Sequence, residues 1–82
     1  MKLHQLRYVR EVVKQGLNIS IAADALHTSQ PGVSKQIQLL EQELNLQIFQ
    51  RSGKRLTGVT EPGRNIVELA ERVIRDMENI KR

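Results

Sequence analysis

Residues 28–40 read as one capped helix, and this segment constrains the fold more than any other part of the 82-residue chain. Thr28 or Ser29 can cap the helix through a side-chain oxygen, and Pro31 then falls in the first turn, where its missing N–H would have no helical partner. The helix is therefore predicted to begin at residue 29 or 30. At about 100° per residue, its apolar residues form one narrow stripe that must face a core: Val33, Ile37, Leu40 and Leu44.

The opposite face of this helix is polar but nearly uncharged. A helix whose outer face only meets water usually carries charged residues there, whereas this face offers a single lysine among serine, proline and glutamine. The residues concerned are Gln30, Pro31, Ser34, Lys35 and Gln38. Such side chains donate and accept hydrogen bonds with little net charge, which suits the reading of base edges in DNA.

Two shorter amphipathic segments precede this helix. The first is predicted to run from residue 2 to about residue 15 and to stop near Gly16, with a stripe made of Leu3, Leu6, Val9 and Val13. The second can be capped by Asn18 or Ser20 and ends near His27, with a contact face made of Ala22, Ala23 and Leu26. Because small residues let the next helix approach closely, we expect a helix-turn-helix over residues 18–44.

After Leu44 the pattern changes from helical to partly alternating. Two short strands around a turn at Ser52-Gly53 predict a β-hairpin, with a second turn at Gly58. Three cations lie at its tip: Arg51, Lys54 and Arg55. The tip is not a phosphate-binding loop, because that loop would need glycine and serine or threonine where Ile48 and Arg55 stand. It is either a DNA-contacting wing, whose cations pair with phosphates or enter a minor groove, or an ordinary basic turn.

From Glu61 onward the chain reads as one long helix with Thr60 as its cap. Its apolar residues recur at spacings of four, three, four and three: Ile66, Ala70, Val73, Met77 and Ile80. A heptad stripe of this kind predicts dimerisation through the long helix, and packing on its own domain is the alternative. Because no glycine or proline ends the pattern, we expect the helix to continue beyond Arg82 and the chain to be an N-terminal portion.

Positive charge gathers in the first sixty residues. That region holds eight basic and four acidic side chains, whereas residues 61–82 hold five of each, so all of the net charge of +4 lies in residues 1–60. Localised positive charge is expected of a nucleic-acid binder, although it also serves to keep a surface soluble.

Several classes of protein are disfavoured by what the sequence lacks. It has no cysteine, and His4 and His27 are too far apart to suggest a local metal motif. Without a metal set, a phosphate loop or a nucleophile beside a base, we expect neither an enzyme nor a cofactor. No apolar run approaches the roughly 18 residues that span a bilayer, and no signal-peptide core is present, so we expect a cytoplasmic protein without a membrane partner.

The order of helix, helix-turn-helix, wing and long helix resembles the DNA-binding domain of LysR-type transcriptional regulators, over essentially all 82 residues. The matching segments are residues 28–37, Leu40-Glu41, residues 48–51, Leu56-Thr57 and Val59-Thr60. Within that family the chain is most similar to the CysB branch, the regulators of sulfur assimilation and cysteine biosynthesis. Residues 17–20, 28–32 and 51–57 carry this closer similarity.

The resemblance implies a mainly α fold. It comprises a winged helix-turn-helix over residues 1–60 with a short β-hairpin wing and a long linker and dimerisation helix over residues 61–82. It also implies a C-terminal effector-binding domain that is absent from this chain. The resemblance implies that ten residues, which match the family's motifs, contact DNA: Asn18, Ser20, Gln30, Pro31, Ser34, Lys35, Gln38, Arg51, Lys54 and Arg55.

The implied partners are double-stranded DNA with an interrupted palindromic operator and a second copy of the chain. The full-length protein would be a dimer or a tetramer, and an acetylated serine would act as inducer only through the missing domain. A helical protein-interaction module with an incidental basic patch is the alternative, and it predicts no salt-dependent binding of DNA.

Two residues or segments depart from the family pattern. Ile21 stands where the family often has a basic residue, so one phosphate contact is expected to be missing or supplied elsewhere. The last helix opens with Glu61-Pro62-Gly63 rather than the commoner Ala-Gly ending, which can alter the angle at which that helix leaves the wing.

Overall fold

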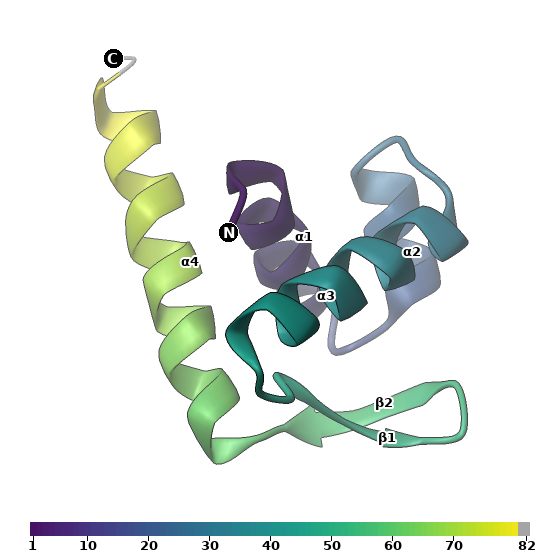
Figure 1. The fold of residues 1–82 in the computed structure, drawn as a ribbon. Helices are drawn as coiled ribbons and strands as arrows, with labels where there is room; N and C mark the ends of the chain where they lie inside the picture. The colour runs from purple at the N-terminus through teal and green to yellow at the C-terminus, as the bar shows by residue number, and fades with distance from the viewer. Residues whose placement is uncertain (81–82) are drawn as a thin grey trace.

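The computed structural model describes residues 1–80, which form four helices and one antiparallel two-stranded hairpin (Figure 1). In chain order the elements are α1 (Leu3–Lys14), α2 (Ile19–Ala25), α3 (Gln30–Leu44), β1 (Phe49–Ser52), β2 (Arg55–Val59) and α4 (Glu61–Ile80). The predicted winged helix-turn-helix with a long last helix is therefore confirmed. The last two residues of the helix predicted over residues 61–82 lie outside the described residues.

Side-chain caps fix the starts of three helices. The Ile21 N–H donates to Asn18 Oδ1 at 3.0 Å where α2 begins, and the Gly32 N–H donates to Ser29 Oγ at 3.1 Å where α3 begins. At the start of α4 the Gly63 N–H donates to Thr60 Oγ1 at 3.0 Å. Each cap satisfies a backbone donor that has no partner within its own helix. Of the alternatives in the sequence, Asn18 rather than Ser20 and Ser29 rather than Thr28 are the caps.

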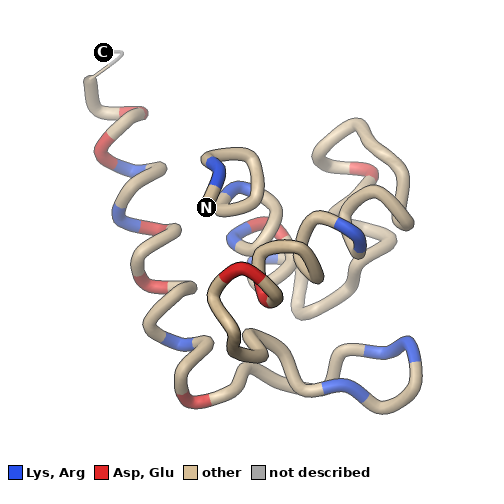
Figure 2. The backbone as a smooth tube through the Cα atoms, viewed as in Figure 1, with Lys and Arg blue, Asp and Glu red and all other residues tan. Residues whose placement is uncertain are grey.

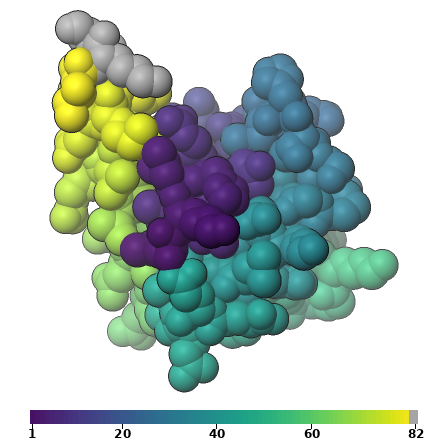
Figure 3. All heavy atoms as spheres, turned by 45° about the horizontal axis from the view of Figure 1, so that its top comes forward, coloured from purple at the N-terminus to yellow at the C-terminus, as the bar shows by residue number. Residues whose placement is uncertain are grey.

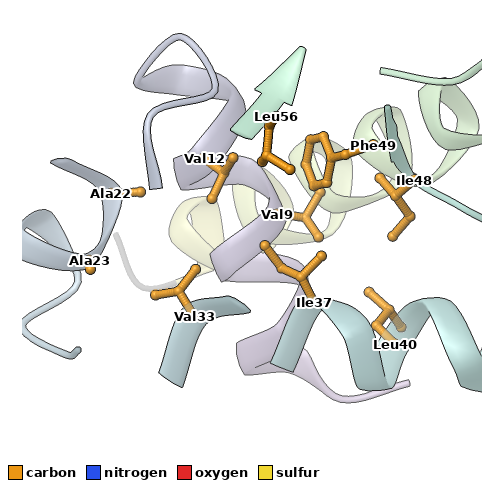
Figure 4. Close-up of a cluster of buried hydrophobic side chains, with 10 residues drawn as sticks. All are labelled: Val9, Val12, Ala22, Ala23, Val33, Ile37, Leu40, Ile48, Phe49 and Leu56. Atoms are coloured by element: carbon orange, nitrogen blue, oxygen red, sulfur yellow. The ribbon is translucent and has the colours of Figure 1, made fainter. Parts of the chain in front are cut away.

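One hydrophobic core joins α1, α2, α3 and the hairpin (Figure 4). The stripe predicted on α3 is confirmed, with Leu44 half-buried and the other three members fully buried. On α1 the prediction was correct at Leu6 and Val9 and in part at Val13, which is half-buried against the core. It was wrong at Leu3, which is exposed, and it missed Val12, which is fully buried. The reason is that α1 packs against α2, α3 and α4 together, so its buried face is broader than one stripe.

The hairpin has a tight turn and one irregularity. Phe49 pairs with Val59 and Ser52 with Arg55, and Gly53 turns the chain with a φ of 63°. The register shifts between Gln50 and Arg51, which is typical of a β-bulge. Gly58 lies within β2 opposite Gln50, so the second turn predicted there was wrong: the chain continues as a strand into the start of α4.

The long helix α4 extends away from the hairpin (Figure 1) and packs beside α1 (Figure 3). Ala70 and Ile74 are buried, and Arg10 of α1 pairs with Glu78 at 3.7 Å. At its start, the Thr60 N–H donates to the Ile48 carbonyl at 2.9 Å. None of the helices within residues 1–80 is both long enough and apolar enough to span a bilayer.

Candidate nucleic-acid interface

A cleft of about 410 Å³ lies between α3 and the hairpin. The buried core residues Ile37 and Leu56 form part of its lining. Six of the ten residues predicted to contact DNA also line it: Gln30, Pro31, Ser34, Gln38, Arg51 and Lys54. The outer face of α3 and the wing therefore face one common space, which is the arrangement that the sequence analysis expected of a recognition helix and its wing.

A second cleft of about 400 Å³ adjoins the first and lies between the start of α2 and the hairpin. Gln30 and Lys54 line both clefts, and the second adds Asn18, Ser20 and Arg55. The two clefts thus bring together nine of the ten predicted residues. Lys35 is the exception: it is exposed on α3 next to Ser34 and lines neither cleft.

The Gln30 side chain is oriented by α2. Ser20 Oγ donates to Gln30 Oε1 at 2.8 Å, so this hydrogen bond joins the first residue of α3 to the helix before it. The bond occupies one lone pair of the amide oxygen and leaves the amide NH₂ group available to donate. The Gln30 NH₂ group therefore lines the cleft and can donate a hydrogen bond to a ligand there.

The clefts carry positive charge that is not neutralised within the described residues. Ion pairs within residues 1–80 involve the N-terminal amino group, Arg10 and Arg51, and none involves Lys35, Lys54 or Arg55. Figure 2 shows the basic residues of the hairpin tip and of α3 without an acidic residue between them. This part of the surface can attract a polyanion such as nucleic acid.

Arg51 is held by Glu41, for which the sequence analysis gave no role. The Glu41 side chain is only 4% exposed, and its Oε1 accepts from Arg51 Nη2 at 2.8 Å. Its Oε2 accepts the Ile48 N–H at 2.7 Å and the Phe49 N–H at 3.2 Å. One buried carboxylate therefore fastens the end of α3 to the start of the hairpin and positions the guanidinium that lines the cleft.

A signal for this pair exists in the sequence but is weak. Glu41 lies one turn after Ile37, at the edge of the apolar stripe of α3, where a carboxylate needs a hydrogen-bonding or cationic partner. Arg51 was predicted to contact DNA, and in the structure its guanidinium also donates a hydrogen bond to the buried Glu41 carboxylate. Only the folded hairpin shows which cation reaches Glu41.

The residues predicted to mediate dimerisation differ in exposure. Ala70 is fully buried within its own chain, and Ile66 packs partly against the core. Val73 and Met77 are half-buried, whereas Ile80 is 84% exposed. Since Ala70 and Ile74 are buried beside α1, the apolar face of α4 is wider than the predicted stripe, and one side of it remains accessible.

Comparisons with known proteins agree with this arrangement. Residues 3–64 match the family described as "Bacterial regulatory helix-turn-helix protein, lysR family". Over all 82 residues the chain is 55% identical to the HTH-type transcriptional regulators SsuR and CysB of Burkholderia cenocepacia, of which it spans 27% and 26%. It thus covers about a quarter of these curated relatives. Its fold is similar to the BenM DBD in complex with benA site 1 DNA, with a TM-score of 0.87 and 32% identity over 98% of this chain and 88% of that one.

Proposed function

The chain belongs to the LysR family of bacterial regulatory helix-turn-helix proteins, and we propose that it binds double-stranded DNA sequence-specifically as the DNA-binding domain of a transcriptional regulator. One observation carries this proposal: nine of the ten residues that the sequence assigns to DNA contact line two adjoining clefts. The similarity to a DNA-binding domain solved with its DNA supports it.

In this proposal α3 lies in the major groove with the stretch from Gln30 to Gln38 against the base edges. The carboxamides of Gln30 and Gln38 can pair with adenine N6 and N7. The Ser34 hydroxyl can donate to an acceptor on a base or accept from a donor. Lys35 reaches guanine or a phosphate. The cations of the wing, Lys54 and Arg55, bind phosphates or the adjoining minor groove, and Asn18 and Ser20 contact the backbone beside α2.

We expect Gln30→Ala to relax sequence preference. The substitution removes a carboxamide whose orientation Ser20 fixes, so discrimination at one base-pair position is expected to fall roughly tenfold. The measurement is selection of bound duplexes from a random pool, followed by titration of the best and scrambled sites at physiological salt. Equal affinities of the parent chain for both sites would contradict the proposed function, and identical preference profiles for parent and variant would contradict base reading by Gln30.

Lys54→Ala is expected to act differently. Because a lysine at the exposed wing tip meets phosphate and not a base, the variant should bind all duplexes more weakly and keep the same preferred sequence. The slope of log affinity against log salt should fall by about one. A changed preference with an unchanged slope would show that Lys54 reads a base.

The proposed dimer pairs the accessible side of α4 with the same side of a second copy. The residues proposed for dimerisation remain Ile66, Ala70, Val73, Met77 and Ile80. Ala70 is buried within its own chain, so its part is to hold α4 in place. A two-fold dimer places its two α3 helices in successive major grooves, or further apart on bent DNA, and so requires an interrupted palindrome. The longer protein would form a dimer or a tetramer.

Val73→Glu is expected to raise the dimer dissociation constant at least about tenfold, because it places a carboxylate in an apolar contact. Sedimentation equilibrium of the parent chain and of the Val73→Glu variant, each without DNA, measures this change in the dissociation constant. Arg72→Ala is the matched control, since Arg72 is exposed on the neighbouring position of α4. An unchanged constant for Val73→Glu would place the dimer contact elsewhere.

We also propose that the regulator controls genes of sulfur assimilation and cysteine biosynthesis. The identity of 55% to proteins named SsuR and CysB supports this assignment. An acetylated serine would be the inducer, and a domain outside this chain would bind it. Binding of selected duplexes by the longer protein, measured with and without O-acetylserine or N-acetylserine, tests the assignment.

A further inference from the structure

The outer face of α3 continues beyond the residues assigned to DNA contact. At about 100° per residue, Gln42 lies within about 40° of Gln38 and within about 20° of Lys35, and it is exposed. Gln42 lines a cleft of about 620 Å³ together with Gln38, Gln47 and Arg51. Since Gln38 and Arg51 also line the cleft between α3 and the hairpin, this surface continues the candidate DNA interface.

This extension offers several hydrogen-bond donors beside the acceptor oxygens of its amides and of the Arg51-paired Glu41 carboxylate. Gln47 Oε1 accepts from Arg51 Nη1 at 2.8 Å, so the Gln47 NH₂ group is the part left to donate. The hydrogen bonds of Arg51 all start at Nη1 and Nη2, and none of them uses its Nε–H. Gln42 adds another NH₂ group. Phosphate oxygens only accept hydrogen bonds, and the NH₂ groups of Gln42 and Gln47 and the Arg51 Nε–H can all donate to one, so this set can bind a phosphate.

The two carboxylates near the end of α3 are both paired. Glu41 is buried against Arg51, and Glu43 binds the N-terminal amino group of Met1. Neither presents an unpaired negative charge to the cleft. A phosphate near Gln42 therefore avoids the repulsion that an exposed, unpaired carboxylate in the last turn of α3 would cause.

The length of α3 decides which part of the DNA lies beside Gln42. With a rise of about 1.5 Å per residue, Gln38 is about 12 Å along the helix from Gln30, and Gln42 is about 18 Å away. The major groove is about 12 Å wide. If α3 crosses the groove with Gln30 and Ser34 at the bases, Gln42 has reached the wall of the groove, where the sugar–phosphate backbone runs.

We propose that Gln42 and Gln47, together with Arg51, bind a backbone phosphate at the edge of the major groove. The inference rests on the proposed function and deepens it, because this contact fixes the position of α3 along the DNA without reading the sequence. It assigns a role to Gln42 and Gln47, which lie outside the set predicted from the sequence.

The first test uses the duplex that the parent chain prefers in selection from a random pool. Gln42→Lys is expected to bind it roughly fivefold more tightly, with a salt slope about one larger, and Gln42→Glu roughly fivefold more weakly. Both should select the same sequence as the parent. Asn65→Ala is the control, because it changes an exposed amide on α4. Equal affinities of the two charge variants, or a new preference at one base pair, would overturn the proposal.

The second test replaces each phosphate of that duplex in turn by a neutral methylphosphonate. At one position the replacement should weaken the parent roughly fivefold but weaken the Gln42→Ala, Gln47→Ala double variant clearly less, because only Arg51 then still contacts that phosphate. If the double variant responds like the parent at every position, the phosphate contact is absent. A parent chain that prefers no duplex would instead overturn the proposed function, so the two failures are distinguishable.

Discussion

Glu41→Ala is expected to lower the free energy of unfolding by about 3 kcal/mol or more, because it leaves buried donors without an acceptor. The substitution removes the acceptor of the Ile48 and Phe49 N–H groups and the partner of Arg51. A buried, unsatisfied N–H costs about 1–3 kcal/mol, and here there are two. Since a small domain has only about 5–15 kcal/mol in total, this loss removes a large part of its stability. Urea unfolding followed by circular dichroism measures the loss.

Two further variants make this prediction specific. Glu41→Gln keeps one oxygen acceptor but turns an NH₂ group toward Arg51, so its loss should be smaller, about 1–2 kcal/mol. Glu43→Ala removes an exposed carboxylate two residues along α3, and its loss should stay within about 1 kcal/mol. Equal losses for Glu41→Ala and Glu43→Ala would show that the buried carboxylate does not fasten the hairpin.

Local chemistry accounts for the features that were predicted correctly. Asn18, Ser29 and Thr60 cap helices through bonds that span three residues, so the sequence places the starts of α2, α3 and α4 to within one or two residues and leaves only the choice between neighbouring caps to the structure. The hairpin turn is equally local, although it falls at Gly53-Lys54, one residue later than predicted. The residues predicted to contact DNA lie on these elements, which is why nine of the ten line adjoining clefts.

The features that were missed depend on distant neighbours. The full burial of Val12 rather than of Val13 follows from three helices packing on α1, and no periodicity within α1 shows how many neighbours it has. The bond between Glu41 and Arg51 spans ten residues and a change from helix to strand. The second turn expected at Gly58 failed for a related reason, because pairing with Gln50 keeps that glycine in the strand.

Gly63→Ala is expected to destabilise the domain by about 2–3 kcal/mol, although alanine favours a helix by about 1 kcal/mol over glycine. Gly63 is buried, and a Cβ there would lie 2.8 Å from Ile48 Cα and even closer to its carbonyl oxygen. These are backbone atoms that the Thr60 N–H bond and the Glu41 carboxylate hold in place. Thermal unfolding of the parent and of the Gly63→Ala variant measures the difference in stability.

Gly32→Ala is a close control, because Gly32 also stands third in its helix after a proline. A Cβ at Gly32 would meet the Ser29 and Thr28 hydroxyl oxygens at 3.0 and 3.4 Å. Ser29 Oγ also caps α3, but it needs to shift by only a few tenths of an ångström and is not backbone, so we expect a loss of about 1 kcal/mol at most. Equal effects of the two substitutions would show that the contact with Ile48 does not constrain α4.

The same contact has a consequence for DNA recognition. Gly63 lets α4 start directly against Ile48. If the proposed dimer forms through α4, the direction in which α4 leaves the hairpin sets where the second copy lies. In the proposed dimer that direction fixes the separation of the two α3 helices and hence the spacing of the half-sites. Where Gly63→Ala remains folded, its selected duplexes should therefore retain the half-site sequence but change the spacing. A change in half-site sequence instead would mean that Gly63 supports α3 rather than the dimer geometry.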